Sequence, residues 1–180
     1  MMIEQLAEQQ AAGAAVPSAV SGRAALLLCY IKRRCSLFFR EREANMLPSN
    51  ELSVYMDELA EIGGYAGVQT IVTNVITAAM HGADIPVRYA TLFYDFLYYV
   101  IDRAAAAWKA GQNYTSILAN IAHEHENITM RLTLPGETHA FRMNADLGRA
   151  VEAAGGVFAV KDLDDAAGLS LSFPLGKSNG

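Results

Sequence analysis

The sequence has few of the residues that mark a secreted or metal-binding protein. It contains only two cysteines, Cys29 and Cys35, among 180 residues. They stand six positions apart on a predicted helix, which separates them by roughly 9 Å along its axis and puts an unstrained disulfide out of reach. We therefore expect two reduced packing residues, as is usual in the cytosol.

Long apolar runs are missing as well. The longest, around residues 26–31 and 96–101, are too short and too interrupted to cross a bilayer. No signal peptide is recognisable at the start of the sequence. We expect a soluble, cytosolic protein, or the cytosolic end of a membrane-bound receptor.

An excess of positive charge is also absent. The net charge of −5 argues against nucleic acid as the main partner. Six of the fourteen basic residues nevertheless fall within residues 23–42. We interpret this segment as a solvated helix face; the alternative is that Lys32, Arg33 and Arg34 contact phosphates or lipid headgroups.

Apolar residues make up 52% of the chain, which is enough to fill a core and excludes a disordered tail. Residues 1–11 predict a short helix, and the small residues of 12–22, with Pro17 among them, predict a linker. Residues 23–43 predict an amphipathic helix, expected to pack on the domain and also on a second copy of the chain. Its apolar stripe consists of Ala24, Leu27, Leu28, Ile31, Cys35, Phe38 and Phe39.

The rest of the chain alternates between helical and strand patterns. A helix is predicted from Pro48-Ser49-Asn50 to Gly63-Gly64, followed by a strand and then by a longer helix. The later part predicts a hairpin, a helix that starts near Phe141, and two closing strands. The predicted ranges are 68–76 and 86–110 for the strand and the long helix, 114–122 and 127–134 for the hairpin, and 157–161 and 168–174 for the last strands. This order favours an α/β (α+β) fold, with a mixed sheet covered by helices on one face.

The segment from Arg149 to Leu175, RAVEAAGGVFAVKDLDDAAGLSLSFPL, resembles the C-terminal end of the ATP-binding domain of sensor histidine kinases. From about Ala24 onward, the order of elements is similar to the same family, with CYIKRRCSLFF (Cys29 to Phe39) in the place of a dimerisation helix. The resemblance implies the two-layer ATPase sandwich that histidine kinases share with gyrase, the Hsp90 chaperone and MutL. It divides the chain into a helix and linker (1–22), a dimerisation-type helix (23–43) and an ATPase-like domain (44–180).

The family's central helix carries a Glu and, four residues later, an Asn that holds magnesium. Aligning LFYDFLYYVIDRA (92–104) with it places Asp95 at the Glu and Tyr99 at the Asn. Asp95 keeps a carboxylate that can act as a general base or orient water. A phenol is a poor magnesium ligand, so the resemblance implies a degenerate site at Tyr99.

The family's next signature is an Asp followed by glycines after the strand that corresponds to 127–134. Its carboxylate accepts a hydrogen bond from the adenine amino group. This chain has Leu134-Pro135-Gly136-Glu137 at that place, so only Glu137 can substitute for the Asp, and its longer side chain behind a proline is a poor geometric copy. The glycine-rich lid of the family is also missing. The phosphoacceptor histidine is missing too, because no histidine occurs within residues 1–42.

Two other groups of residues suggest chemistry at first sight. His123-Glu124-His125-Glu126 has two imidazoles at strand spacing, but zinc needs further ligands, so we interpret the segment as a charged turn and predict no metal site. The aromatic residues between Phe93 and Tyr99 are interpreted as packing residues that fill the core and the vacated nucleotide pocket.

Two functional hypotheses follow. The first is a degenerate histidine kinase-like domain of a bacterial signal-transduction protein, which is a dimeric docking module without ATP turnover and needs no cofactor. The alternative is a functional catalytic domain that binds ATP and magnesium and phosphorylates a histidine in a partner. Expected partners are a second copy, through residues 23–42, and a response regulator or an upstream sensor domain, with no nucleic acid.

Overall fold

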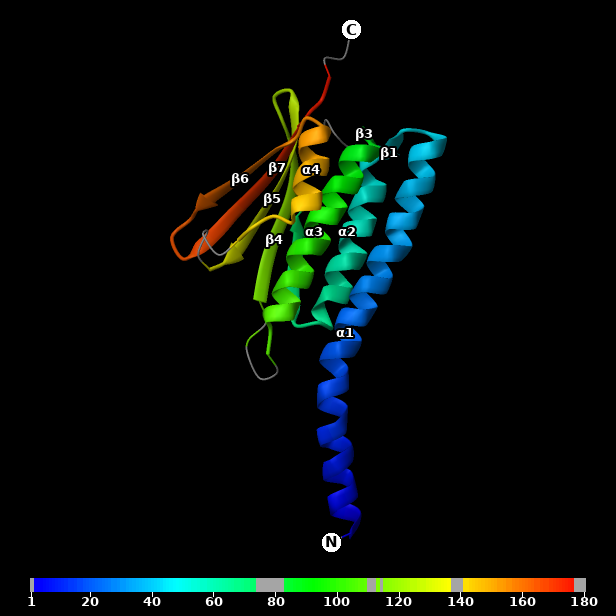
Figure 1. The fold of residues 1–180 in the computed structure, drawn as a ribbon, viewed down its shortest axis with the longest axis vertical. Helices are drawn as coiled ribbons and strands as arrows, with labels where there is room; N and C mark the ends of the chain where they lie inside the picture. The colour runs from blue at the N-terminus through cyan, green and yellow to red at the C-terminus, as the bar shows by residue number, and fades with distance from the viewer. Residues whose placement is uncertain (1, 74–82, 110–112, 114, 137–140, 177–180) are drawn as a thin grey trace.

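The computed structural model describes residues 2–73, 83–109, 113, 115–136 and 141–176, with side chains from residue 21 onward. Four helices and seven strands are found in these ranges (Figure 1). In chain order they are α1 (Met2–Glu43), β1 (Met46–Pro48), α2 (Ser49–Gly64), β2 (Val68–Thr73), β3 (Asp84–Pro86), α3 (Val87–Ala107), β4 (Thr115–Glu124), β5 (Asn127–Pro135), α4 (Ala145–Ala153), β6 (Val157–Asp162) and β7 (Ala166–Pro174).

The main sheet has five strands in the order β2-β4-β5-β7-β6. β2 runs parallel to β4, and all other pairs are antiparallel. α2, α3 and α4 lie on one side of this sheet, and α1 packs outside α2 and α3 (Figure 1). The predicted mixed sheet with helices on one face is confirmed.

α3 is the centre of the core because it has neighbours on every side. Its Phe93 and Phe96 are fully buried toward the sheet, where Phe93 meets the ring of Phe173 from β7 at a centroid distance of 5.3 Å. Its Tyr94 faces α1 and is also fully buried. Aromatic rings of this size, removed completely from water, each stabilise the fold by about 1.5–3 kcal/mol.

α1 packs on the domain with a face that carries both apolar and charged residues. Leu26, Cys29 and Leu37 are buried against the domain, and the ring of Tyr30 stacks on Tyr98 of α3 at 4.0 Å. The predicted apolar stripe lies on other sides of the helix and is exposed, with Leu28 67% accessible. This stripe, defined in full above, is called the α1 stripe below.

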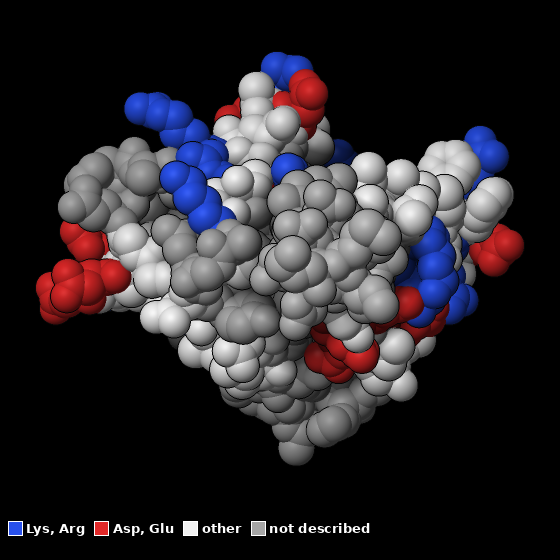
Figure 2. Space-filling view, turned by 90° about the horizontal axis from the view of Figure 1, so that it is seen from below, with Lys and Arg blue, Asp and Glu red and all other residues white. Residues whose placement is uncertain are grey.

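The basic segment of α1 forms ion pairs with the domain. The pairs are Arg23 with Asp102, Lys32 and Arg33 with Glu58, Arg34 with Asp95, and Arg40 with Glu51. The segment is therefore not simply a solvated helix face, because its charges hold α1 against α2 and α3. The end of the molecule seen in Figure 2 shows several small groups of charged side chains, in some of which basic and acidic residues adjoin.

Two expectations about connecting segments were wrong. The linker expected at 12–22 is helical and continuous with residues 23–43; its alanines favour a helix, whereas Gly13 and Pro17 oppose one. The segment between the predicted strand 68–76 and the predicted helix 86–110, expected to be a loop, contains β3, which pairs with β1 in a small antiparallel sheet. Strands of three residues that include prolines have no alternating pattern to predict them.

α4 begins at Ala145 and not near Phe141, because the Asn144 side chain caps it, accepting from the amides of Asp146 at 2.8 Å and Leu147 at 3.3 Å. The predicted strand 68–76 is extended from Val68 to Thr73, and its remainder lies outside the described residues. No helix in the described ranges is both long and apolar enough to span a membrane.

Candidate functional site

Asp95 and Tyr99, the two candidate residues of α3, line one cleft. Its volume is about 400 Å³, and it lies where α1, α3 and the start of α4 meet. The lining residues are Tyr30, Arg34, Asp95, Tyr98, Tyr99, Asn144, Asp146, Leu147 and Ala150. We call it the α1–α3–α4 cleft.

The carboxylate of Asp95 is bound by α1. Arg34 Nε lies 2.7 Å from Asp95 Oδ1, and the Tyr30 hydroxyl donates to the same oxygen at 2.9 Å. The Asp95 side chain is only 15% exposed. Burial raises the pKa of Asp95 above its ordinary value, although Arg34 and the Tyr30 hydrogen bond oppose the shift.

Tyr30 keeps its proton under all ordinary conditions. Burial, and then the neighbouring Asp95 charge, raise the pKa of Tyr30 to about 12. The hydroxyl is therefore a permanent donor to Asp95. Arg34 and Tyr30 together supply the carboxylate with a cation and a hydrogen bond from within the protein.

Tyr99 is engaged with the segment that leads into α4. Its hydroxyl donates to the main-chain oxygen of Arg142 at 2.8 Å, and Arg103 Nη1 donates to the same oxygen at 3.3 Å. The ring of Phe141 packs edge-on against Tyr99 at 6.1 Å, and the Arg103 guanidinium lies 5.5 Å from the Phe141 ring centre. These contacts hold residues 141 and 142 against α3.

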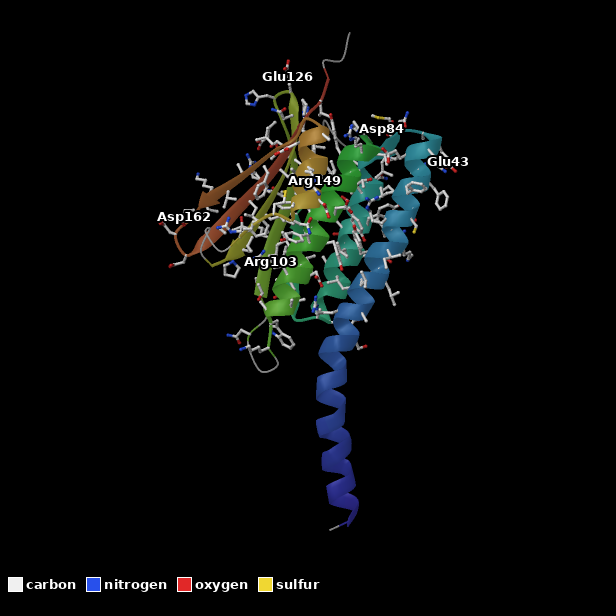
Figure 3. The ribbon with its side chains drawn as sticks, in the orientation of Figure 1. Glu43, Asp84, Arg103, Glu126, Arg149 and Asp162 are labelled. Atoms are coloured by element: carbon white, nitrogen blue, oxygen red, sulfur yellow. The ribbon has the colours of Figure 1, made fainter. Side chains whose placement is uncertain are left out.

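The N-terminus of α4 is capped within the chain. Free N–H groups at a helix start attract phosphate. Here Asn144 Oδ1 accepts from the amides of Asp146 and Leu147. The Asp146 carboxylate, which pairs with Arg149 (labelled in Figure 3), adds negative charge to this turn, and that opposes the binding of an anion.

A second pocket follows the end of β5, where the resemblance places the adenine-binding Asp. Its volume is about 320 Å³. The described lining residues are Val100, Arg103, Ala104, Ala107, Thr115, Leu134, Pro135, Gly136, Phe141 and Ala167. No carboxylate occurs among these described residues, and Glu137 lies outside the described ranges. We call it the β5-end pocket.

The histidine-rich segment divides between two elements. His123 belongs to β4, whereas His125 has a positive φ of 55° in the turn. Glu124 pairs with Arg131 of β5. Asp84 and Glu126 lie at this same end of the molecule (Figure 3), but no three His, Cys, Asp or Glu residues in the described ranges are arranged to hold a metal ion.

Two residues that determine the state of the cleft were not predicted from the sequence. Arg34 and Tyr30 lie 61 and 65 positions before Asp95 in the sequence, and a long-range side-chain pair of this kind has no local pattern. Asn144 is different, since an Asn just before an amphipathic helix is a recognisable capping signal.

The sheet order, the helices on one face and the central α3 define a histidine kinase-like ATPase fold. The histidine kinase domain of the blue-light activated histidine kinase EL346 from Erythrobacter litoralis matches 98% of this chain and 85% of its own, with a TM-score of 0.58 and 13% identity. The catalytic domain of histidine kinase ThkA, in a nucleotide-free form, matches 72% of this chain and 94% of its own, with a TM-score of 0.52 and 12% identity.

The Acinetobacter baumannii histidine kinase AdeS also matches, over 82% of this chain and 76% of its own, with a TM-score of 0.51 and 10% identity. At identities this low, the likeness establishes the fold alone. No protein-family model matches the sequence, and no curated protein matches it. The chemistry of this chain has to be inferred from its own residues.

Proposed function

We propose that this chain is a degenerate histidine kinase-like domain of a signal-transduction protein, serving as a dimeric docking module without ATP turnover. The observation that carries the proposal is the state of Asp95. Its carboxylate is held by Arg34 and Tyr30 of α1 and is largely covered. A general base or a metal-orienting group has to face the ligand, and this one faces another helix.

The positions that the family uses for magnesium and phosphate are also engaged within this chain. Tyr99 stands at the position of the family's metal-binding Asn, and its hydroxyl donates a hydrogen bond to the main-chain oxygen of Arg142. Mg²⁺ prefers carboxylate, amide and phosphate oxygens, so a phenol in this state is a poor replacement. The start of α4, the nearby helix N-terminus, is already capped by Asn144.

Recognition of adenine requires an acceptor for its amino group and space for its ring. The β5-end pocket has a lining of mostly apolar residues, with Phe141 on one side and Arg103 as the charged residue among those described. A guanidinium donates hydrogen bonds and does not accept them. The pocket therefore lacks, in its described part, the group that the family uses to recognise adenine.

The α1 stripe supports the dimeric part of the proposal. Leu27, Leu28, Ile31, Phe38 and Phe39 are all exposed on a helix that already packs on its own domain. A contiguous apolar patch with this spacing is typical of a helix–helix interface. A second copy of α1 buries it, and the partners that the function implies are a response regulator or an upstream sensor domain.

Thermal unfolding with ATP and magnesium tests the loss of nucleotide binding. If ATP bound with a dissociation constant of about 10 μM, then 1 mM ATP would stabilise the fold by about 2.7 kcal/mol. For a chain of this size, that corresponds to a rise in Tm of roughly 5–10 °C. We expect no rise, and a rise of that size supports the alternative of a functional ATP-binding catalytic domain.

A further inference from the structure

A groove runs along the free edge of the main sheet, between β2 and α2. β2 is the terminal strand of the sheet among the described residues, since it pairs only with β4. The groove has a volume of about 590 Å³ and is lined by Asp57, Ala60, Glu61, Gly64, Gln69, Thr70 and Val72. We call it the edge groove.

The backbone of β2 presents hydrogen-bonding groups to this groove. The amide of Thr115 in β4 donates to the carbonyl of Gly67 at 3.2 Å. This bond establishes which residues of β2 turn their backbone groups toward β4 in the parallel ladder. In a parallel strand, the N–H and C=O of one residue point to the same side, and those of the next residue point to the opposite side. Gln69 therefore faces β4, whereas Thr70 and Val72 turn their N–H and C=O groups toward the edge groove.

The side chains of the edge groove are polar and acidic. Thr70 Oγ1 is buried and has no hydrogen-bond partner among the residues that the structure describes. Asp57 and Glu61 are one helical turn apart on α2, are exposed, and form no ion pair within the described part of the chain. The groove thus combines a strand edge, a buried hydroxyl without a partner and two carboxylates without counter-charges.

We propose that the edge groove binds an extended basic segment of a partner protein, which adds a strand to β2 and places Lys or Arg against Asp57 and Glu61. Edge strands bind peptides in this way through main-chain hydrogen bonds, while alternate side chains provide specificity. Side chains on the α2 side of the added strand meet the two carboxylates. Those on the other side lie beside the exposed Ile71, so the segment alternates basic and apolar residues.

The charge of the groove also argues against a second copy of the chain as its occupant. Pairing β2 with β2 of another copy across a two-fold axis brings two sets of Asp57 and Glu61 close together. Four carboxylates brought close together repel one another, which destabilises such a pair, whereas a basic segment neutralises them. This inference does not depend on the loss of ATP binding, because no residue of the edge groove lines the α1–α3–α4 cleft.

Fluorescence anisotropy with a labelled peptide of alternating Lys and Val tests the proposal on the full chain. The peptide should bind the wild type, while versions with Pro in place of Val or Glu in place of Lys should not. The double variant Asp57→Asn/Glu61→Gln should weaken binding about tenfold at low salt and reduce its salt sensitivity. The matched control Glu152→Gln/Asp162→Asn, which removes two exposed carboxylates elsewhere, should bind as the wild type does.

Val72→Pro tests the main-chain part of the interaction. It deletes an N–H that points away from β4, a position at which edge strands tolerate proline, so the fold should be kept and peptide binding lost. Hydrogen exchange should show new protection at residues 68–73 when the peptide is bound. If Val72→Pro fails to fold, the double carboxylate variant and the exchange pattern still decide the question.

Four results would overturn the proposal. The first is no binding at millimolar peptide, and the second is equal binding to the wild type and to Asp57→Asn/Glu61→Gln. The third is protection that maps to another surface. The fourth is a dimer that Val72→Pro converts to a monomer, because the edge would then belong to a second copy.

Discussion

Replacing Asp95 separates a structural role from a catalytic one. Asp95→Ala leaves the Arg34 guanidinium and the Tyr30 hydroxyl without their shared acceptor. Removing one partner of a buried pair costs about 3–5 kcal/mol, but the Arg34 side chain is 37% exposed, so water replaces part of the interaction. We therefore expect Asp95→Ala to lower the free energy of unfolding by about 2–3 kcal/mol.

Asp102→Ala is the matched control. Asp102 lies on the same helix and pairs with Arg23 of the same α1, but the two side chains are 32% and 46% exposed. An exposed pair contributes about 0–1 kcal/mol. Because both variants place Ala on α3, the gain in helix propensity is the same and cancels in the comparison.

Urea unfolding at one fixed protein concentration measures both variants, since a dimer makes stability depend on concentration. Asp95→Asn should cost less than about 1 kcal/mol, because the amide oxygen still accepts from Tyr30 and Arg34. Catalytic residues commonly oppose stability, so their removal is neutral or stabilising. An Asp95→Ala protein as stable as the wild type or as Asp102→Ala would refute the structural role.

Two further predictions concern α1. Phe38→Asp places a charge in the exposed α1 stripe and should convert a dimer to a monomer, as measured by light scattering, with the fold intact. The control variant Val157→Asp on β6 should remain a dimer. A monomeric wild type would contradict the proposed dimer. Burial alone raises the pKa of Glu58, but its hydrogen bonds and ion pairs with Lys32 and Arg33 outweigh burial and lower it. The stability from Glu58 is therefore present above its unfolded pKa of about 4.5 and is lost as the pH falls through the lower, folded value. Accordingly, Glu58→Gln should have a lower free energy of unfolding than the wild type at pH 7. The difference should shrink when urea unfolding is repeated at successively lower pH. A difference that stays constant with pH would contradict this.

The sequence predicted the main sheet and its covering helices well, because their signals are local. The alternation in 127–134 and in the last strand corresponds to buried residues of β5 and β7 such as Met130 and Leu171. The Gly-Gly pair at 155–156 follows α4 as expected, with Gly155 at a positive φ of 74°. Periodicity of this kind depends only on the element itself.

The sequence could not predict which partner each face of α1 meets. Its most apolar face is the exposed α1 stripe, while the domain-facing side contains the partly buried Tyr30 and Arg34 beside its buried apolar residues. The polar atoms of that side are matched by acidic residues of α2 and α3 far along the chain, such as Glu58 and Asp95. Periodicity identifies an apolar face but not its neighbour.

The site could be predicted only in part for the same reason. Alignment to the family pattern placed Asp95 and Tyr99 on α3, and the structure brings both to one cleft. The roles inferred for them stay predictions, as does any role of Glu137, which lies outside the described residues. The pairing of Asp95 with α1 depends on how helices distant in sequence pack, which no local pattern contains.

Calorimetric titration of the full chain with ATP and magnesium decides whether the domain has lost nucleotide binding. We expect no binding heat up to millimolar ATP, for the wild type and for Asp95→Ala alike, because the carboxylate, the phenol and the start of α4 are already engaged within the chain. A micromolar dissociation constant for the wild type that Asp95→Ala abolishes would contradict it and establish a working nucleotide site.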